Sequence, residues 1–552
     1  KNELCLVSLS DGGKDAKTIR EYNLKTQSFV KDGFFIPESK TDATWVDENT
    51  LFICDGTNPK TLTNSGYPTV VKKLKRGQST EDAKIIFTGQ ATDVSVWIHN
   101  YYRGDKHYLI LNRAITFFKG ETFLISPDEN TDLKKIPMPE DADFVQIFNG
   151  QFLFSNRSPF KVKTTTYKAG SVFSFSFTEL ENPEYRVVFT PTLTQFFEFA
   201  VPTKNYLSAT VLDDVIKSVL KYTYKNKMWT SEKVSLGQAG NTSIMAFSGE
   251  SDQVYLNYTS FLNPTEFHFT DLNKNGSLKK VMTSPVRFNA KDFVAHQYKT
   301  KSSDGTVIPY FIVHHKNLKL DGSNPTLLYG YGGFEYALTP HYLGATGKAW
   351  VEKGGIYVLA NIRGGGEYGP EWHQSVLKEK RQLVFNDFYA IAEDLISRKI
   401  TSPKHLGIMG GSNGGLLTSV AFTQRPDLFN AVVSEVPLAN MMEYHKWLAG
   451  NSWMDEYGNP DIPSEREYLL KYSPLHNLNA DKKYPEVFYV TSTKDDRVHP
   501  AHARQMVARL RELNHPVIYF ENKDGGHGRA ANMTEYAKLL ALEYTYLFQK
   551  LF

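Results

Sequence analysis

The sequence predicts two domains of different fold class: an all-β domain over residues 1–284, and an α/β domain with a doubly wound, mostly parallel sheet over residues 285–552. Short aromatic and β-branched segments, separated by Gly, Asn, Asp and Pro, fill the first half and indicate strands. From about Phe293 onwards, strand-like segments alternate with helix-like segments, as in a sheet covered by helices on both faces. A chain of 552 residues is also too long for one ordinary core.

The composition is that of a globular protein and excludes several function classes. Apolar residues make up 41% and charged residues 22% of the chain, and no stretch approaches the roughly 18 uncharged apolar residues of a membrane span. The net charge of +3 gives no sign of nucleic-acid binding. The two cysteines, Cys5 and Cys54, exclude a disulfide framework and a cysteine-rich metal site. We therefore expect no metal, cofactor, nucleic-acid partner or membrane partner. A monomer is also expected, although the composition does not bear on the oligomeric state.

The chain begins with Lys1 rather than Met, and no charged-then-apolar leader follows. We expect that the start of the gene product was removed or is not included, so a targeting signal cannot be read. The low cysteine count suits the cytoplasm, which is the expected compartment, and a lost leader would equally fit a periplasm.

One apolar segment per unit recurs along the first domain and defines its period. The segments are residues 51–53, 108–110, 152–154, 206–207 and 254–256. The 203 residues from Phe52 to Tyr255 cover four steps of about 51 residues, close to the length of a four-stranded propeller blade, so a propeller is favoured over a β-sandwich. Seven blades would need about 350 residues. We therefore expect a seven-bladed propeller in the intact protein, with one or two blades upstream of Lys1.

Two polar segments of this domain have a structural interpretation. The basic cluster at residues 72–76 is interpreted as the solvated edge of a blade, because lysines on an edge strand prevent edge-to-edge pairing. Residues 212–215, Leu-Asp-Asp-Val, are interpreted as a hairpin turn between two strands. No segment of the first domain carries a convincing catalytic constellation.

The second domain is predicted to begin with a hairpin and to continue as alternating strands and helices. Residues 293–300 and 307–313 flank a Ser-Ser-Asp-Gly turn. Further strands are predicted at residues 326–329, 356–362, 405–409, 431–435, 487–491 and 517–520, and helices at residues 387–399, 416–422, 501–513 and 533–551. Functional groups of such sheets collect at the carboxyl ends of the strands.

A glycine-rich turn, Gly-Gly-Ser-Asn-Gly-Gly at residues 410–415, lies between the strand at 405–409 and the next helix. A strand, a sharp turn with serine at its tip and a helix form a nucleophile elbow. Ser412 must hold a strained backbone there, and glycines at positions 410 and 414 remove side chains that would clash. The helix start offers backbone N–H groups to an oxyanion. A solvent turn that happens to contain serine is the competing interpretation, and the flanking strand and helix favour catalysis.

A serine hydroxyl is a weak nucleophile and needs a base that is itself oriented. Asp495 follows the strand at 487–491, and His527 follows the strand at 517–520 between glycines. Serine, aspartate, histidine is the chain order of α/β-hydrolases, so this fold is predicted for the second domain. His527 would take the proton of Ser412, and Asp495 would hold the imidazole tautomer and stabilise its charged form.

The second domain resembles the prolyl oligopeptidase family, serine peptidases that cleave after proline. The resemblance rests on the motifs YGYGGF at residues 329–334, NIRGGGEYG at 361–369, GGSNGG at 410–415, WMDEYG at 453–458, DDRV at 495–498 and GHG at 526–528. It covers the whole second half, whereas the first half agrees only in its propeller-like character. The resemblance implies a propeller that covers the active site and admits short peptides, and an upstream segment that packs on the hydrolase domain.

By motif position, the resemblance implies Ser412, Asp495 and His527 as the catalytic triad. Tyr331 would donate its phenol hydrogen to the oxyanion, beside the backbone N–H of Asn413. The implied proline-binding residues are Trp453, Tyr457, Phe334, Val498 and Leu438, and Arg497 would bind a peptide carbonyl upstream of the scissile bond. An indole face suits the flat pyrrolidine ring, and the other apolar side chains would exclude water.

The predicted reaction is hydrolysis of short peptides on the carboxyl side of proline through an acyl-enzyme. A related oligopeptidase that cleaves after Arg or Lys would need carboxylates in the pocket, and Glu367 and Glu456 are near in sequence. An esterase or lipase would share the triad without needing Arg497 or a propeller. A binding scaffold with an inactive hydrolase domain would be expected to lack a triad residue. Arg363 and Glu367 are interpreted as a structural ion pair or loop anchor rather than as catalytic groups.

Overall fold

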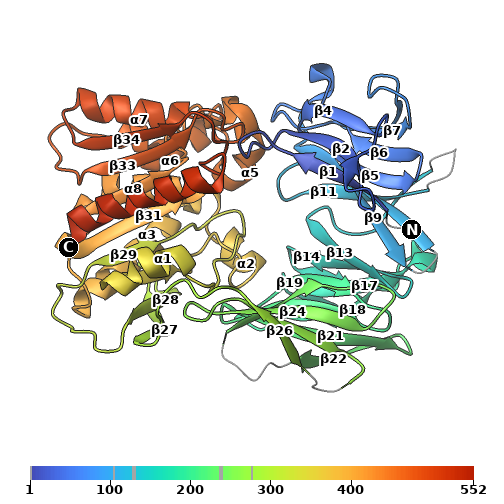
Figure 1. Cartoon of the computed structure of the whole chain (residues 1–552), viewed down its shortest axis with the longest axis horizontal. Coiled ribbons are helices and arrows are strands. Elements are labelled where there is room, and N and C mark those ends of the chain that lie inside the picture. Colours follow the sequence, from blue (N-terminus) through green and yellow to red (C-terminus); the bar gives the residue numbers. More distant parts are fainter. Residues whose placement is uncertain (1–2, 104–105, 127–131, 235–239, 275–277) are drawn as a thin grey trace.

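A computed structural model describes residues 3–103, 106–126, 132–234, 240–274 and 278–552. It contains a β-propeller domain and an α/β-hydrolase domain, which lie side by side (Figure 1). The last propeller strand ends at Thr283, and the first strand of the hydrolase sheet begins at Phe293. Both predicted fold classes are confirmed.

The described residues of the propeller domain form six four-stranded antiparallel sheets. The first three consist of β1 (Leu4–Leu9), β2 (Lys17–Asn23), β3 (Ser28–Phe29) and β4 (Phe35–Ser39); β5 (Asp42–Asp47), β6 (Thr50–Cys54), β7 (Val70–Lys75) and β8 (Lys84–Thr88); and β9 (Ser95–Arg103), β10 (Lys106–Ala114), β11 (Gly120–Ile125) and β12 (Leu133–Lys135). The next three consist of β13 (Ala142–Phe148), β14 (Gln151–Asn156), β17 (Val172–Ser176) and β18 (Arg186–Phe189); β19 (Gln195–Pro202), β20 (Leu207–Asp213), β21 (Ile216–Lys225) and β22 (Met228–Val234); and β23 (Asn241–Ala246), β24 (Gln253–Thr259), β25 (Glu266–Asp271) and β26 (Lys279–Thr283). A short ribbon, β15 (Phe160–Val162) with β16 (Thr165–Tyr167), lies between β14 and β17 in the chain. The seventh blade stays a prediction.

The recurring apolar segments occupy equivalent places in five of these sheets. They lie on, or at the start of, β6, β10, β14, β20 and β24, which are the second strands of their sheets in chain order. Every residue of β6 and β14 is buried. These strands have a neighbour on each side within the sheet. Four of them, β6, β10, β14 and β20, also bury a run of consecutive residues on both faces, which explains their apolar sequences, whereas β24 buries Val254 and Leu256 but exposes Gln253 and Tyr255.

The basic cluster at residues 72–76 is not a solvated blade edge, and that prediction is wrong. β7 lies between β6 and β8 within its sheet. The Nζ atom of Lys72 lies 2.6 Å from the carboxylate of the fully buried Asp55. Arg76 pairs with the buried Glu21 at 2.7 Å. Buried carboxylates from other strands make these cations tolerable inside the domain, and the local sequence does not reveal them.

The hydrolase domain is built on an eight-stranded sheet with the order β27-β28-β30-β29-β31-β32-β33-β34. Its strands are β27 (Phe293–Lys301), β28 (Val307–His315), β29 (Thr326–Tyr329), β30 (Ile356–Ala360), β31 (Leu406–Gly411), β32 (Ala431–Glu435), β33 (Val487–Ser492) and β34 (Val517–Asn522). The first two form the predicted hairpin, and every pairing from β30 to β34 is parallel. The carboxyl ends of these parallel strands therefore meet at one edge of the sheet.

Helices cover both faces of this sheet (Figure 1). They are α1 (Gly344–Ala349), α2 (Pro370–Gln374), α3 (Gln382–Ser397), α4 (Asn413–Gln424), α5 (Met454–Tyr457), α6 (Pro463–Tyr472), α7 (Ala501–Glu512) and α8 (Met533–Leu551). Ile408 and Val432 belong to an apolar cluster with α3, α4 and α7, whereas the next residues, Met409 and Val433, belong to a second cluster with α1 and α8. Burial on both faces explains the continuous apolar runs of the strands.

The carboxyl ends of the parallel strands face the propeller. After β34, the backbone N–H of Gly526 donates to the carbonyl of Gly12 in the propeller at 2.6 Å. The predicted hairpin turn at residues 212–215 is confirmed between β20 and β21, and it also contacts the hydrolase domain. Asp214 pairs with Lys299 at 2.8 Å, and the fully buried Val215 belongs to the second cluster of the hydrolase domain.

Candidate active site

The backbone at Ser412 has the strained geometry predicted for a nucleophile elbow. Ser412 lies between β31 and α4, with φ 59° and ψ −116°. A Cβ atom at Gly410 would lie 2.5 Å from the carbonyl oxygen of Gly414, and one at Gly414 would lie 2.6 Å from the carbonyl oxygen of Gly330. Only glycine fits these two positions, so the chain can turn sharply and present Ser412 at the strand end.

The predicted base and acid meet at the same edge of the sheet. Asp495 follows β33 and His527 follows β34, and the Nδ1 atom of His527 lies 2.7 Å from Oδ2 of Asp495. The other carboxylate oxygen accepts backbone N–H groups of Arg497 and Val498, each at 3.0 Å. Because a carboxylate only accepts, Nδ1 carries the hydrogen and Nε2 is left to accept a proton. The arrangement can therefore support general-base chemistry.

Two groups suited to an oxyanion lie in the elbow and next to it. The backbone N–H of Asn413 belongs to the first turn of α4, where N–H groups lack helical partners. Tyr331 follows β29, the strand next to β31. Burial raises the pKa of the Tyr331 phenol. The phenol therefore stays protonated at neutral pH and can donate a hydrogen bond.

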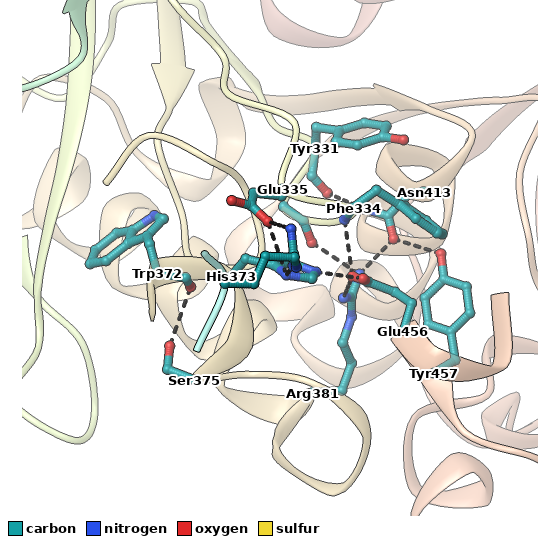
Figure 2. Close-up of polar contacts among 12 residues, drawn as sticks. Tyr331, Phe334, Glu335, Trp372, His373, Ser375, Arg381, Asn413, Glu456 and Tyr457 are labelled. Carbon is teal, nitrogen blue, oxygen red and sulfur yellow. Dashed lines mark hydrogen bonds and ion pairs between the residues drawn. The ribbon is translucent and has the colours of Figure 1, made fainter. Parts of the chain in front are cut away.

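The side chain of Asn413 connects these two groups. Its Nδ2 donates to the Tyr331 carbonyl at 2.6 Å, and its Oδ1 accepts from Arg381 at 2.5 Å and from the Tyr457 hydroxyl at 2.8 Å. Figure 2 shows these contacts around Asn413. Arg381 also binds Glu456, with 2.5 Å between Nη1 and Oε1. The structure thus adds Arg381, which the sequence did not indicate, and gives Glu456, considered above only for basic substrates, a cationic partner within the protein.

The aromatic residues predicted to bind proline form one cluster beside the elbow. The Phe334 ring lies 5.7 Å from the Tyr457 ring and 6.5 Å from the Trp453 ring, both in edge-to-face geometry. The predicted residues Val498 and Leu438 are buried in the same core cluster. Phe117 of the propeller lies 5.1 Å from the Phe334 ring. Both domains therefore contribute to the apolar surface near Ser412.

Arg497 has a partner that the sequence did not indicate. Its Nε and Nη2 atoms donate to the carboxylate of Asp15 in the propeller at 3.0 and 2.6 Å. The backbone N–H groups of Asp15 and Ala16 donate to the Asp496 carboxylate at 2.8 and 2.9 Å. The propeller segment at residues 15–16 therefore fixes the loop that carries Asp495.

Comparison with known proteins decides the family. The family model described as "Prolyl oligopeptidase, N-terminal beta-propeller domain" matches residues 1–282, and the one described as "Prolyl oligopeptidase family" matches residues 342–551. The chain belongs to the prolyl oligopeptidase family. The resemblance inferred from the motifs is confirmed, and the chain is a serine peptidase.

Several relatives of the prolyl oligopeptidase family match almost the whole chain. An uncharacterized peptidase of Sinorhizobium fredii is 44% identical over 563 residues, which cover 100% of this chain and 77% of the relative. The prolyl endopeptidase of Elizabethkingia meningoseptica is 31% identical over 97% of this chain and 75% of its own length. The structure of a post-proline cleaving enzyme from Rickettsia typhi superposes with a TM-score of 0.95 at 35% identity, covering 100% of this chain and 82% of that one.

Two carboxylates considered for binding basic substrates are not free in this prolyl oligopeptidase family member. Glu456 is fully buried and contacts both His373 and Arg381. Burial alone would raise the pKa of Glu456, but these two contacts outweigh burial and lower it. Glu367 is buried and has no cationic partner among the residues that the structure describes, and burial raises its pKa to about 8. Glu456 is thus already neutralised by its partners, and Glu367 is uncharged at neutral pH.

Of the two structural interpretations of Arg363 and Glu367, the ion pair is wrong and the loop anchor fits the structure. Arg363 binds the fully buried Asp387 at 2.7 Å and Asp304 at 2.6 Å. Glu367 instead accepts the backbone N–H of Leu338 at 3.0 Å. Both side chains anchor the glycine-rich loop, as predicted, but through separate partners that local sequence does not identify.

A cavity of about 730 Å³ lies between the two domains near the elbow. Phe196 and Lys217 of the propeller line one part of it. Tyr329, Glu435 and Arg529 line another part. Tyr329 and Arg529 are two residues from Tyr331 and His527 in the sequence, and the backbone carbonyl of Glu435 accepts the Ser412 N–H. Its volume is in the range of small-ligand sites, so part of a short peptide would fit.

The described ranges contain neither a metal-binding cluster nor a membrane-spanning helix. Over these residues, no group of three or more His, Cys, Asp or Glu side chains is arranged to hold a metal ion. No helix in the part of the chain that the structure describes is long and apolar enough to cross a membrane.

Proposed function

We propose that this protein is an endopeptidase that hydrolyses short peptides on the carboxyl side of proline through an acyl-enzyme on Ser412. The observation that carries the proposal is the position of Tyr457. Its hydroxyl binds Asn413, the residue after Ser412, while its ring belongs to the aromatic cluster with Phe334 and Trp453. A flat, apolar surface therefore adjoins the nucleophile and suits a pyrrolidine ring.

In the acylation step, Nε2 of His527 takes the proton of the Ser412 hydroxyl as Oγ bonds to the scissile carbonyl carbon. The charge that develops on the carbonyl oxygen is stabilised by the Tyr331 phenol and the Asn413 N–H. His527 then gives the proton to the leaving amine, and the C–N bond breaks. Asp495 stabilises the positive imidazole in the meantime, through the 2.7 Å contact to Nδ1.

In the deacylation step, His527 takes a proton from water as the water oxygen bonds to the acyl carbon. The Ser412–acyl bond breaks, and Oγ recovers the proton from His527. The same two donors stabilise the second oxyanion. The products are a peptide that ends in proline and the free enzyme.

Cleavage after Arg or Lys is the second candidate, and the structure disfavours it. A basic side chain needs an ionised carboxylate that is free to pair. Glu456 already binds Arg381 and His373, and burial keeps Glu367 uncharged at neutral pH. The prolyl endopeptidase and the post-proline cleaving enzyme among the relatives further support proline. The contacts of Arg497 and the propeller near the site favour a peptide over an esterase or lipase substrate.

The test compares blocked chromogenic peptides with proline, arginine or lysine at the cleaved position. We expect proline peptides to be hydrolysed fastest, and Ser412→Ala to abolish turnover. Ser397→Ala, at the exposed end of α3, is the matched control and should leave turnover unchanged. Faster turnover of arginine peptides would overturn the proline assignment, and full activity of Ser412→Ala would overturn the mechanism. The monomeric state and the cytoplasmic location stay predictions.

A further inference from the structure

A continuous chain of buried polar side chains connects the propeller with the oxyanion groups. It consists of Arg157, His373, Glu456, Arg381 and Asn413, which we call the buried relay. Arg157 is 6% exposed, and the other four are between 0% and 1% exposed. Figure 2 shows how His373, Glu456, Arg381 and Asn413 follow one another.

The first half of the buried relay crosses from the propeller into the hydrolase domain. Arg157, which follows β14, places Nη2 3.1 Å from Nδ1 of His373. A guanidinium can only donate, so Nδ1 is the acceptor and Nε2 carries the imidazole hydrogen. That hydrogen is donated to Oε2 of Glu456 at 2.6 Å. The contact with Arg157 therefore selects the His373 tautomer that binds Glu456.

The second half of the buried relay reaches both oxyanion groups. Nη1 of Arg381 donates to Oε1 of Glu456 at 2.5 Å. Nη2 of Arg381 donates to Oδ1 of Asn413 at 2.5 Å and to the Gly332 carbonyl at 2.9 Å. Nδ2 of Asn413 in turn donates to the Tyr331 carbonyl at 2.6 Å. Arg381 thus positions Asn413, which carries the N–H donor, and through Asn413 it positions Tyr331, which carries the phenol.

Burial makes the buried relay sensitive to the loss of any member. A buried charge that loses its partner is strongly destabilised, so the remaining groups rearrange rather than stay unpaired. Stabilisation of an oxyanion depends on donors held within a few tenths of an ångström of their productive positions. A shift of Arg381 would therefore reach Tyr331 and Asn413 directly.

We propose that Arg381 and Glu456 are positioning residues for the oxyanion site, and that Arg157 makes their arrangement depend on contact with the propeller. The oxyanion site is then fully formed only when the propeller is seated on the hydrolase domain. The inference rests on the acyl-transfer role proposed for Ser412 and Tyr331. It does not depend on the residue preferred at the cleaved position.

The test is a kinetic double-mutant cycle with the Tyr331 phenol. Arg381→Lys keeps the charge but cannot bind Glu456 and Asn413 together as the guanidinium does. We expect it to lower kcat about tenfold with little change in KM when Tyr331 is present, and less than about threefold in the Tyr331→Phe background. Arg186→Lys, which alters a mostly buried arginine of the propeller that pairs with Glu179, is the control and should act equally in both backgrounds.

A second variant, Arg157→Met, tests the contact with the propeller, and its result does not depend on how well Arg381→Lys folds. Arg157→Met should lower kcat about fivefold, again much less in the Tyr331→Phe background. Equal effects of Arg381→Lys or Arg157→Met in both backgrounds would overturn the inference. A rise in KM alone for Arg157→Met would assign it to substrate binding instead. Full activity of Ser412→Ala would overturn the proposed function. If Ser412→Ala is inactive but the effects of Arg381→Lys and Arg157→Met are the same with and without the Tyr331 phenol, only this inference is overturned.

Discussion

Asp15 of the propeller and Arg497 of the hydrolase domain form a two-point ion pair, with 3.0 Å from Nε to Oδ2 and 2.6 Å from Nη2 to Oδ1. The backbone N–H of Arg497 also donates to Asp495 at 3.0 Å. The pair therefore connects the propeller to the acid that orients His527. It also fixes the guanidinium predicted to bind a peptide carbonyl, and the described contacts leave Nη1 for that purpose.

Removal of the Asp15 charge should weaken substrate binding. Asp15→Asn loses the charge-assisted bond that orients Arg497, and such bonds contribute roughly 1.5–3 kcal/mol. We expect KM for a proline peptide to rise about tenfold with a smaller change in kcat. Steady-state kinetics over a series of peptide concentrations measure both values.

Asp11→Asn is the matched control, because Asp11 pairs with Lys494 at 3.1 Å across the same interface but is 62% exposed. Exposed pairs contribute little, so its KM should stay within about threefold of the parent value. A KM for Asp15→Asn that falls below the parent value would show that Asp15 competes with the substrate for Arg497.

The Tyr331 hydroxyl should contribute to the rate rather than to binding. Tyr331→Phe removes the phenol donor and leaves the ring and the backbone contact with Asn413 in place. Loss of one oxyanion donor lowers kcat by about 10²-fold or more. We expect that decrease with KM nearly unchanged. Tyr336→Phe, whose ring lies 5.4 Å from the Tyr331 ring, is the control; equal losses in both variants would contradict the assignment.

The sequence contained enough information to predict the residues that lie next to a strand end. Ser412 is surrounded by its own strand, glycines and helix within ten or so residues, and Asp495 and His527 each come shortly after a strand. Parallel pairing then brings strand ends together without any further information. Four of the recurring propeller segments are predictable for a similar reason, since a strand buried on both faces is apolar over its buried run.

The partners of the buried charges could not be predicted, because tertiary packing alone selects them. Arg381 and Glu456 are separated by 75 residues, and Arg497 and Asp15 by 482. The local sequence predicts a solvated edge for Lys72, because the buried Asp55 that pairs with it directly follows a different strand, β6. The one available signal was Glu456 itself, a charge within the aromatic motif at residues 453–458, which indicates a buried cation nearby.

The indole of Trp453 should set the preference for proline. Trp453→Leu keeps an apolar side chain but removes the flat face and its edge contact with Phe334. We expect kcat/KM for proline peptides to fall by about tenfold or more, with a much smaller change for alanine peptides. Trp447→Leu, which alters a tryptophan packed on His502, controls for general destabilisation. It should lower kcat/KM for proline and alanine peptides by the same factor. If Trp453→Leu leaves the ratio of kcat/KM for proline and alanine peptides unchanged, the indole does not determine the specificity.

The buried His502 should make the domain less stable in acid. Its Nδ1 accepts the backbone N–H groups of Ala439 and Asn440 at 3.2 and 3.1 Å, so the folded protein needs the neutral imidazole. Burial, with a smaller contribution from His499, lowers the pKa of His502 from 6.5 to about 3. Between these two values the unfolded chain binds a proton that the folded chain does not. Its contribution to stability is complete above pH 6.5 and is lost as the pH falls towards 3.

His502→Asn isolates this effect, because the amide oxygen can accept the same N–H groups but does not titrate. Over pH 4.5 to 6.5, the free energy of unfolding of the parent protein should change by up to about 1.4 kcal/mol per pH unit more steeply than that of the variant. Urea unfolding at each pH measures both curves, and all other titrating groups cancel in the difference. Parallel curves for His502→Asn and the parent protein would show that His502 is protonated in the folded state, and that the two N–H groups have another acceptor.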